Sequence, residues 1–95
     1  MLNNNTNEFI DHTTYEECAV QYKDKKYFFH GLIYWKDTKE YSYDIAIYNG
    51  DEYVGLIFDE RNQDKDTIMK MAFDKPLFEG KTFWEAEKDM DWIEW

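Results

Sequence analysis

Four strand-like runs, separated by short polar breaks, constrain this chain more than any other feature of its sequence. Each run is rich in aromatic and β-branched residues, which favour strand over helix. The runs cover residues 15–22, 26–36, 40–48 and 51–59. Short connections join strands that are antiparallel neighbours, so the sequence predicts a four-stranded antiparallel meander.

Two positions within these runs carry turn or bulge signals. Asn49-Gly50 separates the third run from the fourth and predicts a type I′ hairpin turn, which needs positive φ at both central residues. Gly31 interrupts the second run and predicts a bulge or a close approach of another backbone. In the third run, alternation places Tyr43 and Ile45 on one face and Asp44 on the other.

After the fourth run, the spacing of apolar residues changes to a helical period. Asp64 or Asp66 can cap a helix over about residues 66–73, and Pro76 ends it. Its apolar face consists of Ile68, Met69, Ala72 and Phe73. One helix packed on one face of a meander makes a two-layer α+β domain.

The two ends of the chain give weaker signals. Residues 1–13 are dominated by Asn and Thr, so we expect a loosely ordered segment there, followed by a single acidic domain over residues 14–95. Residues 82–95 read as a short helix or as a strand. Thr82 and Glu85 match a capping box, which favours a helix over about 82–89 followed by an extended segment from Met90.

Composition sets the classes of partner that this domain suits. The 95 residues carry a formal net charge of −10, and 20% of them are aromatic. An acidic chain repels nucleic acid and anionic membranes, so we expect a basic protein partner, no direct nucleic-acid binding and no membrane contact. The sequence leaves the oligomeric state open. The high ratio of Lys to Arg is typical of AT-rich bacterial or phage genomes. The single cysteine cannot form an internal disulfide and fits a reducing cytosol, so we expect a cytoplasmic location in a bacterial host cell.

The predicted partner-binding site is the acidic C-terminal segment. Residues 85–95 hold five acids and one Lys, and three tryptophans lie beside them. The acids are Glu85, Glu87, Asp89, Asp91 and Glu94, the tryptophans are Trp84, Trp92 and Trp95, and a second acidic site is Asp59 with Glu60. The alternative is that the acids form only a solvated face and that the tryptophans complete a small core.

Sequence motifs for catalysis and cofactor binding are absent. The four glycines do not form a phosphate-binding loop, and there is no nucleophile elbow. The single cysteine, Cys18, could pair with His30 as nucleophile and base, but a buried structural Cys is the simpler interpretation. One Cys and two distant His do not make a zinc site, and the alternating acids lack the glycine and final Glu of a calcium loop. We therefore predict no enzyme activity, no metal and no cofactor.

In general character the chain resembles inhibitors encoded by phages and mobile elements, including anti-CRISPR proteins and other DNA mimics. The resemblance covers small size, acidity and aromatic content, and no motif. It implies a non-catalytic inhibitor that occupies the basic nucleic-acid-binding surface of a defence protein. Two alternatives stay open. One is an immunity protein or antitoxin that neutralises a basic toxin, and the other is a structural or small-molecule-binding module with its ligand between sheet and helix.

Overall fold

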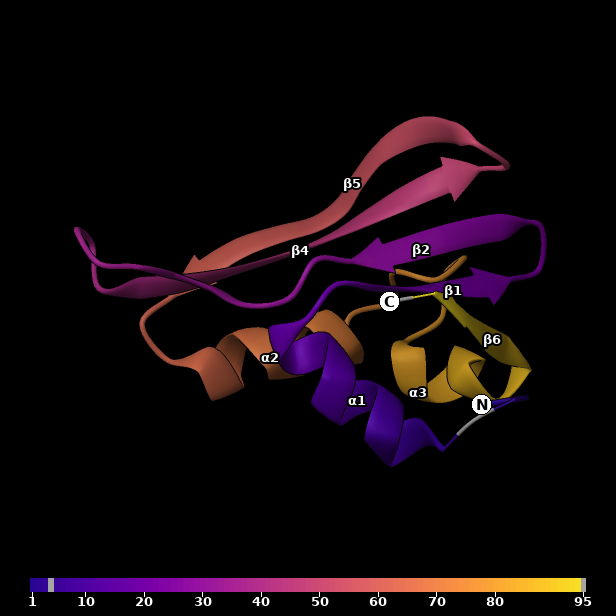
Figure 1. Ribbon diagram of the computed structural model, residues 1–95, viewed down its shortest axis with the longest axis horizontal. Coiled ribbons are helices and arrows are strands. Elements are labelled where there is room, and N and C mark those ends of the chain that lie inside the picture. Colours follow the sequence, from indigo (N-terminus) through magenta and orange to yellow (C-terminus); the bar gives the residue numbers. More distant parts are fainter. Residues whose placement is uncertain (4, 95) are drawn as a thin grey trace.

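The structure is a computed structural model that describes residues 1–3 and 5–94, with Glu94 described by its backbone alone. Within these residues, six strands form one antiparallel sheet (Figure 1). The strands are β1 (Cys18–Tyr22), β2 (Lys25–Phe29), β3 (Ile33–Trp35), β4 (Glu40–Asn49), β5 (Glu52–Asn62) and β6 (Met90–Glu94). The predicted α+β class and the antiparallel meander are confirmed. The C-terminal strand β6 extends the sheet by pairing with β1.

The second predicted run is divided into two strands that lie along the same edge of β4. β2 pairs with the second half of β4 and β3 with its first half, while β5 pairs with the opposite edge. Gly31 lies in the break with φ +80°, and a Cβ there would be 3.0 Å from the carbonyl carbon and oxygen of Tyr15. The close backbone approach predicted at Gly31 is therefore confirmed, and it explains why one run becomes two strands.

The hairpin between β4 and β5 turns one residue later than predicted. Asn49 pairs with Glu52 at the end of the ladder, so the central turn residues are Gly50 and Asp51. Gly50 has φ +63°, and glycine at the first central position is the preference of a type II′ turn. The predicted type I′ turn at Asn49-Gly50 was wrong because Asn49 completes the ladder.

The helices predicted in the second half of the chain are confirmed. α2 covers Lys65–Asp74, and the Asp64 side chain caps it by accepting from the Asp66 backbone N–H. α3 covers Phe83–Ala86 and continues as a 3₁₀ turn, η1, over Glu87–Asp89. The capping box at Thr82 and Glu85 is present, and the chain becomes extended at Met90 as expected.

The N-terminal segment differs from its prediction as a loosely ordered stretch. It contains a ten-residue helix, α1 (Thr6–Tyr15), whose first N–H groups are capped by the Asn5 side chain. Phe9 is fully buried beneath the sheet. The Tyr43 hydroxyl donates to the Thr13 carbonyl at 3.0 Å and lies 2.8 Å from the Thr13 hydroxyl. Few apolar residues hold this helix, so the average polarity of the segment concealed it.

The α-helices of the described residues, α1, α2 and α3, lie on the same side of the sheet (Figure 1). Between the two layers the core is built from stacked and edge-to-face rings whose neighbouring centroids are 4.7–6.5 Å apart. These rings belong to Phe9, Phe29, Phe73, Phe78 and Phe83. Burying each such ring contributes about 1.5–3 kcal/mol. No helix of the described residues covers the other side of the sheet, which we call the open face.

Candidate partner-binding surface

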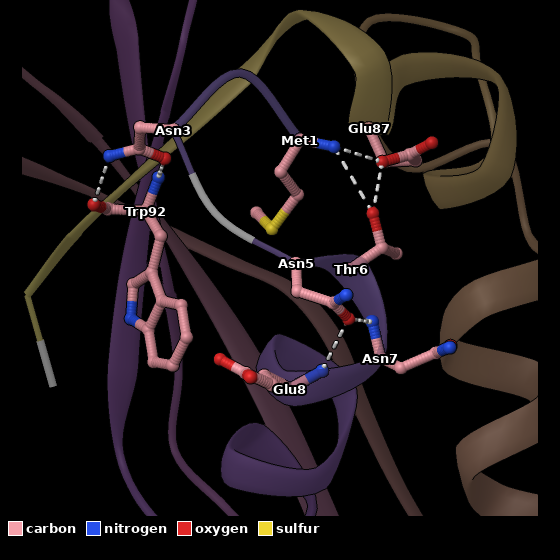
Figure 2. Close-up of polar contacts among 8 residues, drawn as sticks. All are labelled: Met1, Asn3, Asn5, Thr6, Asn7, Glu8, Glu87 and Trp92. Atoms are coloured by element: carbon pink, nitrogen blue, oxygen red, sulfur yellow. Dashed lines mark hydrogen bonds and ion pairs between the residues drawn. The ribbon is translucent and has the colours of Figure 1, made fainter.

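The N-terminal residues hold the C-terminal segment through a group of polar contacts (Figure 2). The Glu87 carboxylate accepts hydrogen bonds from the Met1 ammonium and from the Thr6 hydroxyl, both at 2.7 Å. These two donors lower the pKa of Glu87 from its ordinary value. Glu87, predicted as a partner-binding acid, is therefore half-buried and already neutralised within the fold.

Asn3 forms the second part of this contact group and covers the outer edge of β6. Its side-chain amide donates to the Trp92 carbonyl and accepts from the Trp92 N–H, each at 2.9 Å (Figure 2). The Leu2 N–H donates to the Met90 carbonyl at 2.9 Å, one pleat away. An edge strand with occupied hydrogen-bonding groups cannot easily add another strand, so this end of the sheet is closed.

Three further acids of the predicted C-terminal site are described by the structure, and they do not form one row. Glu85 is exposed, but its carboxylate accepts from the Thr82 N–H, which lowers the pKa of Glu85. Asp89 is exposed in η1. Asp91 is half-buried on β6, opposite Gln21 of β1. The Glu94 side chain lies outside the described residues.

Trp84 and Trp92, the two described tryptophans of the predicted site, lie beside different helices. Trp84 is about half-exposed, packs against Phe73 and donates from Nε1 to Asp74 at 2.9 Å. Trp92 is half-buried and meets the Phe9 ring edge-on at 5.3 Å. One ring therefore lies beside α2 and the other beside α1. Trp95 lies outside the described residues.

The secondary acidic site is divided between two faces of β5. Glu60 approaches Lys75 of α2, with 3.7 Å between Oε1 and Nζ. Asp59 is exposed on the open face, directly opposite Asp44 of β4. Sequence adjacency placed these two acids together, but side chains of neighbouring strand residues point to opposite faces.

The outer face of α1 is an acidic surface that the sequence interpretation missed. Glu8, Asp11 and Glu16 are exposed, and together with His12 and Tyr15 they line a shallow depression of about 400 Å³. The spacing of these five residues is that of one helix face. Residues 1–22 contain neither Lys nor Arg, and this charge imbalance was the available sequence signal.

α1 lies beside α3 in the helical layer (Figure 1), with the Phe9 and Phe83 rings stacked at 5.7 Å. The exposed acids of α3 and η1 therefore belong to the same layer as those of α1. We call this set the acidic helix face: Glu8, Asp11, Glu16, Glu85 and Asp89. Cations near it include Lys65, whose Nζ lies 3.3 Å from the Tyr15 hydroxyl.

Cys18 and His30 do not form a catalytic pair in this arrangement. Cys18 is buried on the core side of β1, and burial raises the pKa of its thiol to about 12. His30 contacts Asp44 through Nδ1, next to the open face. A thiol that stays protonated is a poor nucleophile.

Two shallow hollows lie on helix surfaces of the described residues. Besides the depression on α1, one of about 310 Å³ lies along α2, lined by Thr67, Lys70, Met71, Asp74 and Lys75. Core side chains fill the space between sheet and helices. Among the described residues, no cluster of three or more His, Cys, Asp or Glu is arranged to hold a metal ion. No described helix has the length and apolar character needed to cross a bilayer.

Comparisons of this chain with protein-family models, with curated proteins and with solved structures returned no match.

Proposed function

We propose that this protein is a non-catalytic binding protein that places its acidic helix face against a basic protein surface of the kind that binds nucleic acid. One observation carries the proposal: Glu8 and Asp11 of α1 and its C-cap residue Glu16 are exposed around one hollow, and residues 1–22 supply no Lys or Arg to neutralise them. Acids concentrated in this way attract a cationic surface and steer its approach.

The spacing of these carboxylates suits a surface that contacts a phosphate backbone. Along the helix axis Glu8 and Asp11 are about 4.5 Å apart, and Glu16 follows directly after the last helical residue. A surface that contacts a phosphate backbone presents several Lys and Arg side chains to closely spaced negative charges. Lys and Arg side chains placed to meet phosphates can therefore reach the carboxylates.

α1 holds these acids on a fixed element, which favours tight binding. Asn5 caps its N-terminus, and Phe9 and Thr13 anchor its inner face. At its C-terminal end, the Leu32 N–H donates to the Thr14 carbonyl at 2.9 Å. A rigid arrangement loses less entropy on binding than a flexible acidic segment.

Within this class we propose an inhibitor encoded by a phage or mobile element, which occupies the nucleic-acid-binding surface of a bacterial defence protein. An immunity protein or antitoxin acting on a basic toxin uses the same electrostatics. The genomic neighbourhood separates the two, because an adjacent toxin gene favours the second function and a phage early operon favours the first.

The test begins with capture from lysate of the source cell on the immobilised protein, followed by mass spectrometry. The captured protein is then purified and its binding to labelled DNA or RNA is measured with increasing amounts of this protein. The proposal predicts competitive loss of nucleic-acid binding, complete near one equivalent. A partner whose nucleic-acid binding is unaffected at saturation, or a captured protein with an acidic surface, contradicts it.

A further inference from the structure

The open face is the large surface of the sheet that the fold leaves uncovered, because both sheet edges are protected. Asn3 and Leu2 occupy the outer edge of β6. The opposite edge, β5, has register shifts against β4 at Ile45/Ala46 and at Ile47/Tyr48. Such bulges disrupt an edge and discourage strand addition. A second molecule can therefore contact the sheet more readily through its open face than through its edges.

Exposed apolar side chains occupy both ends of the open face. Tyr53 is 55% and Leu56 46% exposed near the β4–β5 turn, and Ile33 is 44% and Trp35 37% exposed at the β3 end. An aromatic ladder, Phe28–Tyr48–Tyr53, crosses the first of these ends with centroids 4.8 and 5.4 Å apart. Exposed apolar clusters such as these are typical of interaction surfaces.

Between these two apolar ends lie neighbouring rows of opposite charge. Asp44 and Asp59 are directly opposite on β4 and β5, and like charges in that position are unfavourable. In the next row along the strands Arg61 is opposite Ser42, and its guanidinium lies 4.4 Å from the Trp35 ring centroid. The Asp59 carboxylate makes no hydrogen bond or ion pair with any residue that the structure describes.

We propose that the open face binds the open face of a second copy of this chain. The two-fold axis would run across the strands, between the Asp59 row and the Arg61 row. Rotation about that axis places Asp59 opposite the second copy's Arg61, and Asp44 opposite the second copy's Ser42. It also places Phe28 opposite the second copy's Trp35, since β2 and β3 lie along the same edge of β4. Each contact occurs twice, as a two-fold interface requires.

The rotation brings three strand positions of each copy face to face, namely β5, β4 and the edge shared by β2 and β3, because β1 and β6 lie beside β2 alone. Three positions about 4.8 Å apart and about ten residues of about 3.3 Å each give roughly 480 Å² per copy. This is less than the about 800 Å² per partner of a standard interface, so we expect a weak dimer that forms as concentration rises. The charges of the two central rows are complementary under this rotation, because Arg61 of each copy meets Asp59 of the other. Facing sheets turn the acidic helix faces outward, so the excess negative charge of the two copies stays apart.

The dimer is independent of the proposed function and is tested on the isolated protein. Sedimentation equilibrium from about 1 to 200 µM should show a mass approaching twice the 11.7 kDa of the chain. Asp59→Arg and Arg61→Asp each replace two attractive pairs per dimer with two repulsive ones, so each should raise the dimer Kd at least about tenfold. The double variant restores the pairing with reversed sign and should return the Kd to within about threefold of the parent.

Two further variants make the result specific to this face. Asp11→Arg makes the same charge change as Asp59→Arg on the acidic helix face and should leave the dimer intact. Ile33→Lys introduces a charge into the apolar area without touching the ion pairs and should give monomer. Circular dichroism confirms folding of each variant, since all of these side chains are exposed.

Three outcomes overturn the dimer. They are a parent protein that is monomeric up to about 200 µM, a dimer that tolerates both single reversals, and a double variant that stays as weak as the singles. If the parent is monomeric and Ile33→Lys instead lowers the affinity for the captured basic partner, the open face binds that partner. A monomeric protein that still competes with nucleic acid leaves the proposed function standing.

Discussion

Replacing Glu87 by Gln tests whether this carboxylate stabilises the fold or is available to bind a partner. Gln has nearly the same shape but no charge. Glu87 accepts from the Met1 ammonium and the Thr6 hydroxyl, both at 2.7 Å, and its side chain is 22% exposed. The substitution therefore weakens a charge-assisted contact and leaves the packing unchanged.

The expected loss follows from the two hydrogen bonds. Bonds to charged groups contribute about 1.5–3 kcal/mol, and neutral ones about 0.5–1.5 kcal/mol. We expect Glu87→Gln to lower the free energy of unfolding by about 1–2 kcal/mol at pH 7. In a domain of this size, each kcal/mol lowers Tm by roughly 4–8 °C.

The loss should also depend on pH. Folding lowers the pKa of Glu87, so its ionised form stabilises the fold above the unfolded-state pKa. That stabilisation disappears as pH falls through the folded-state pKa. Urea denaturation followed by circular dichroism should therefore show a clear difference between parent and variant at pH 7, and a much smaller one near pH 3.

Asp89→Asn is the matched control, because it removes the same charge from an exposed neighbour in η1. Its effect on stability should be within about 0.5 kcal/mol. The reasoning is refuted if Glu87→Gln is no worse than this control at pH 7, or if its deficit is as large at pH 3. Because Glu87 contributes to stability, a charge reversal there would disturb the fold and is a poor probe of partner binding.

Three further predictions concern the packing of the fold. In urea denaturation, Gly31→Ala should destabilise the protein by about 1–3 kcal/mol more than Gly80→Ala. Both glycines have φ near +80°, but only at Gly31 does the new Cβ meet the end of α1, at 3.0 Å. Equal losses of stability would contradict this. Asn3→Ala should lower stability by about 1 kcal/mol and speed hydrogen exchange of the Trp92 N–H, which loses its acceptor; unchanged exchange would remove the edge-capping role. Cys18, whose pKa is raised to about 12 by burial, should resist a thiol reagent at pH 8 until urea unfolds the protein; rapid labelling of the native state would show that the thiol is accessible.

Much of the sheet could be predicted because its signals are local. The alternation in residues 40–48 fixed which face of β4 enters the core, and Tyr43 and Ile45 are indeed buried while Asp44 is not. The helix at 66–73 and the capping box at Thr82 also depend on neighbouring residues alone. Such features need no knowledge of the rest of the fold.

Features that depend on contacts distant in sequence could not be predicted in the same way. α1 is held by Phe9 and by the bond between Thr13 and Tyr43, which lies 30 residues away. The division of the second run depends on Gly31 meeting Tyr15. Neither contact leaves a periodic pattern in the sequence.

The candidate site shows the same limit. Counting acids located a charge excess in residues 85–95, but it could not show that Glu87 would be neutralised by Met1 and Thr6. Nor could it show that Trp84 and Trp92 would lie beside different helices. The acids of α1 were countable, yet without the helix nothing indicated that Glu8, Asp11 and Glu16 share one face.

The most direct test of the account is the affinity of the captured basic partner for three forms of the protein. One variant, Asp11→Lys with Glu16→Lys, reverses two charges of the acidic helix face. The control, Asp37→Lys with Glu52→Lys, makes the same net change at two exposed sites, one in the turn between β3 and β4 and one at the start of β5. If the partner binds through the acidic helix face, isothermal titration calorimetry should show that affinity falls at least about 100-fold for the first variant and less than about threefold for the control. Equal losses would show that only net charge matters, and an unchanged affinity of the first variant would remove α1 from the binding surface.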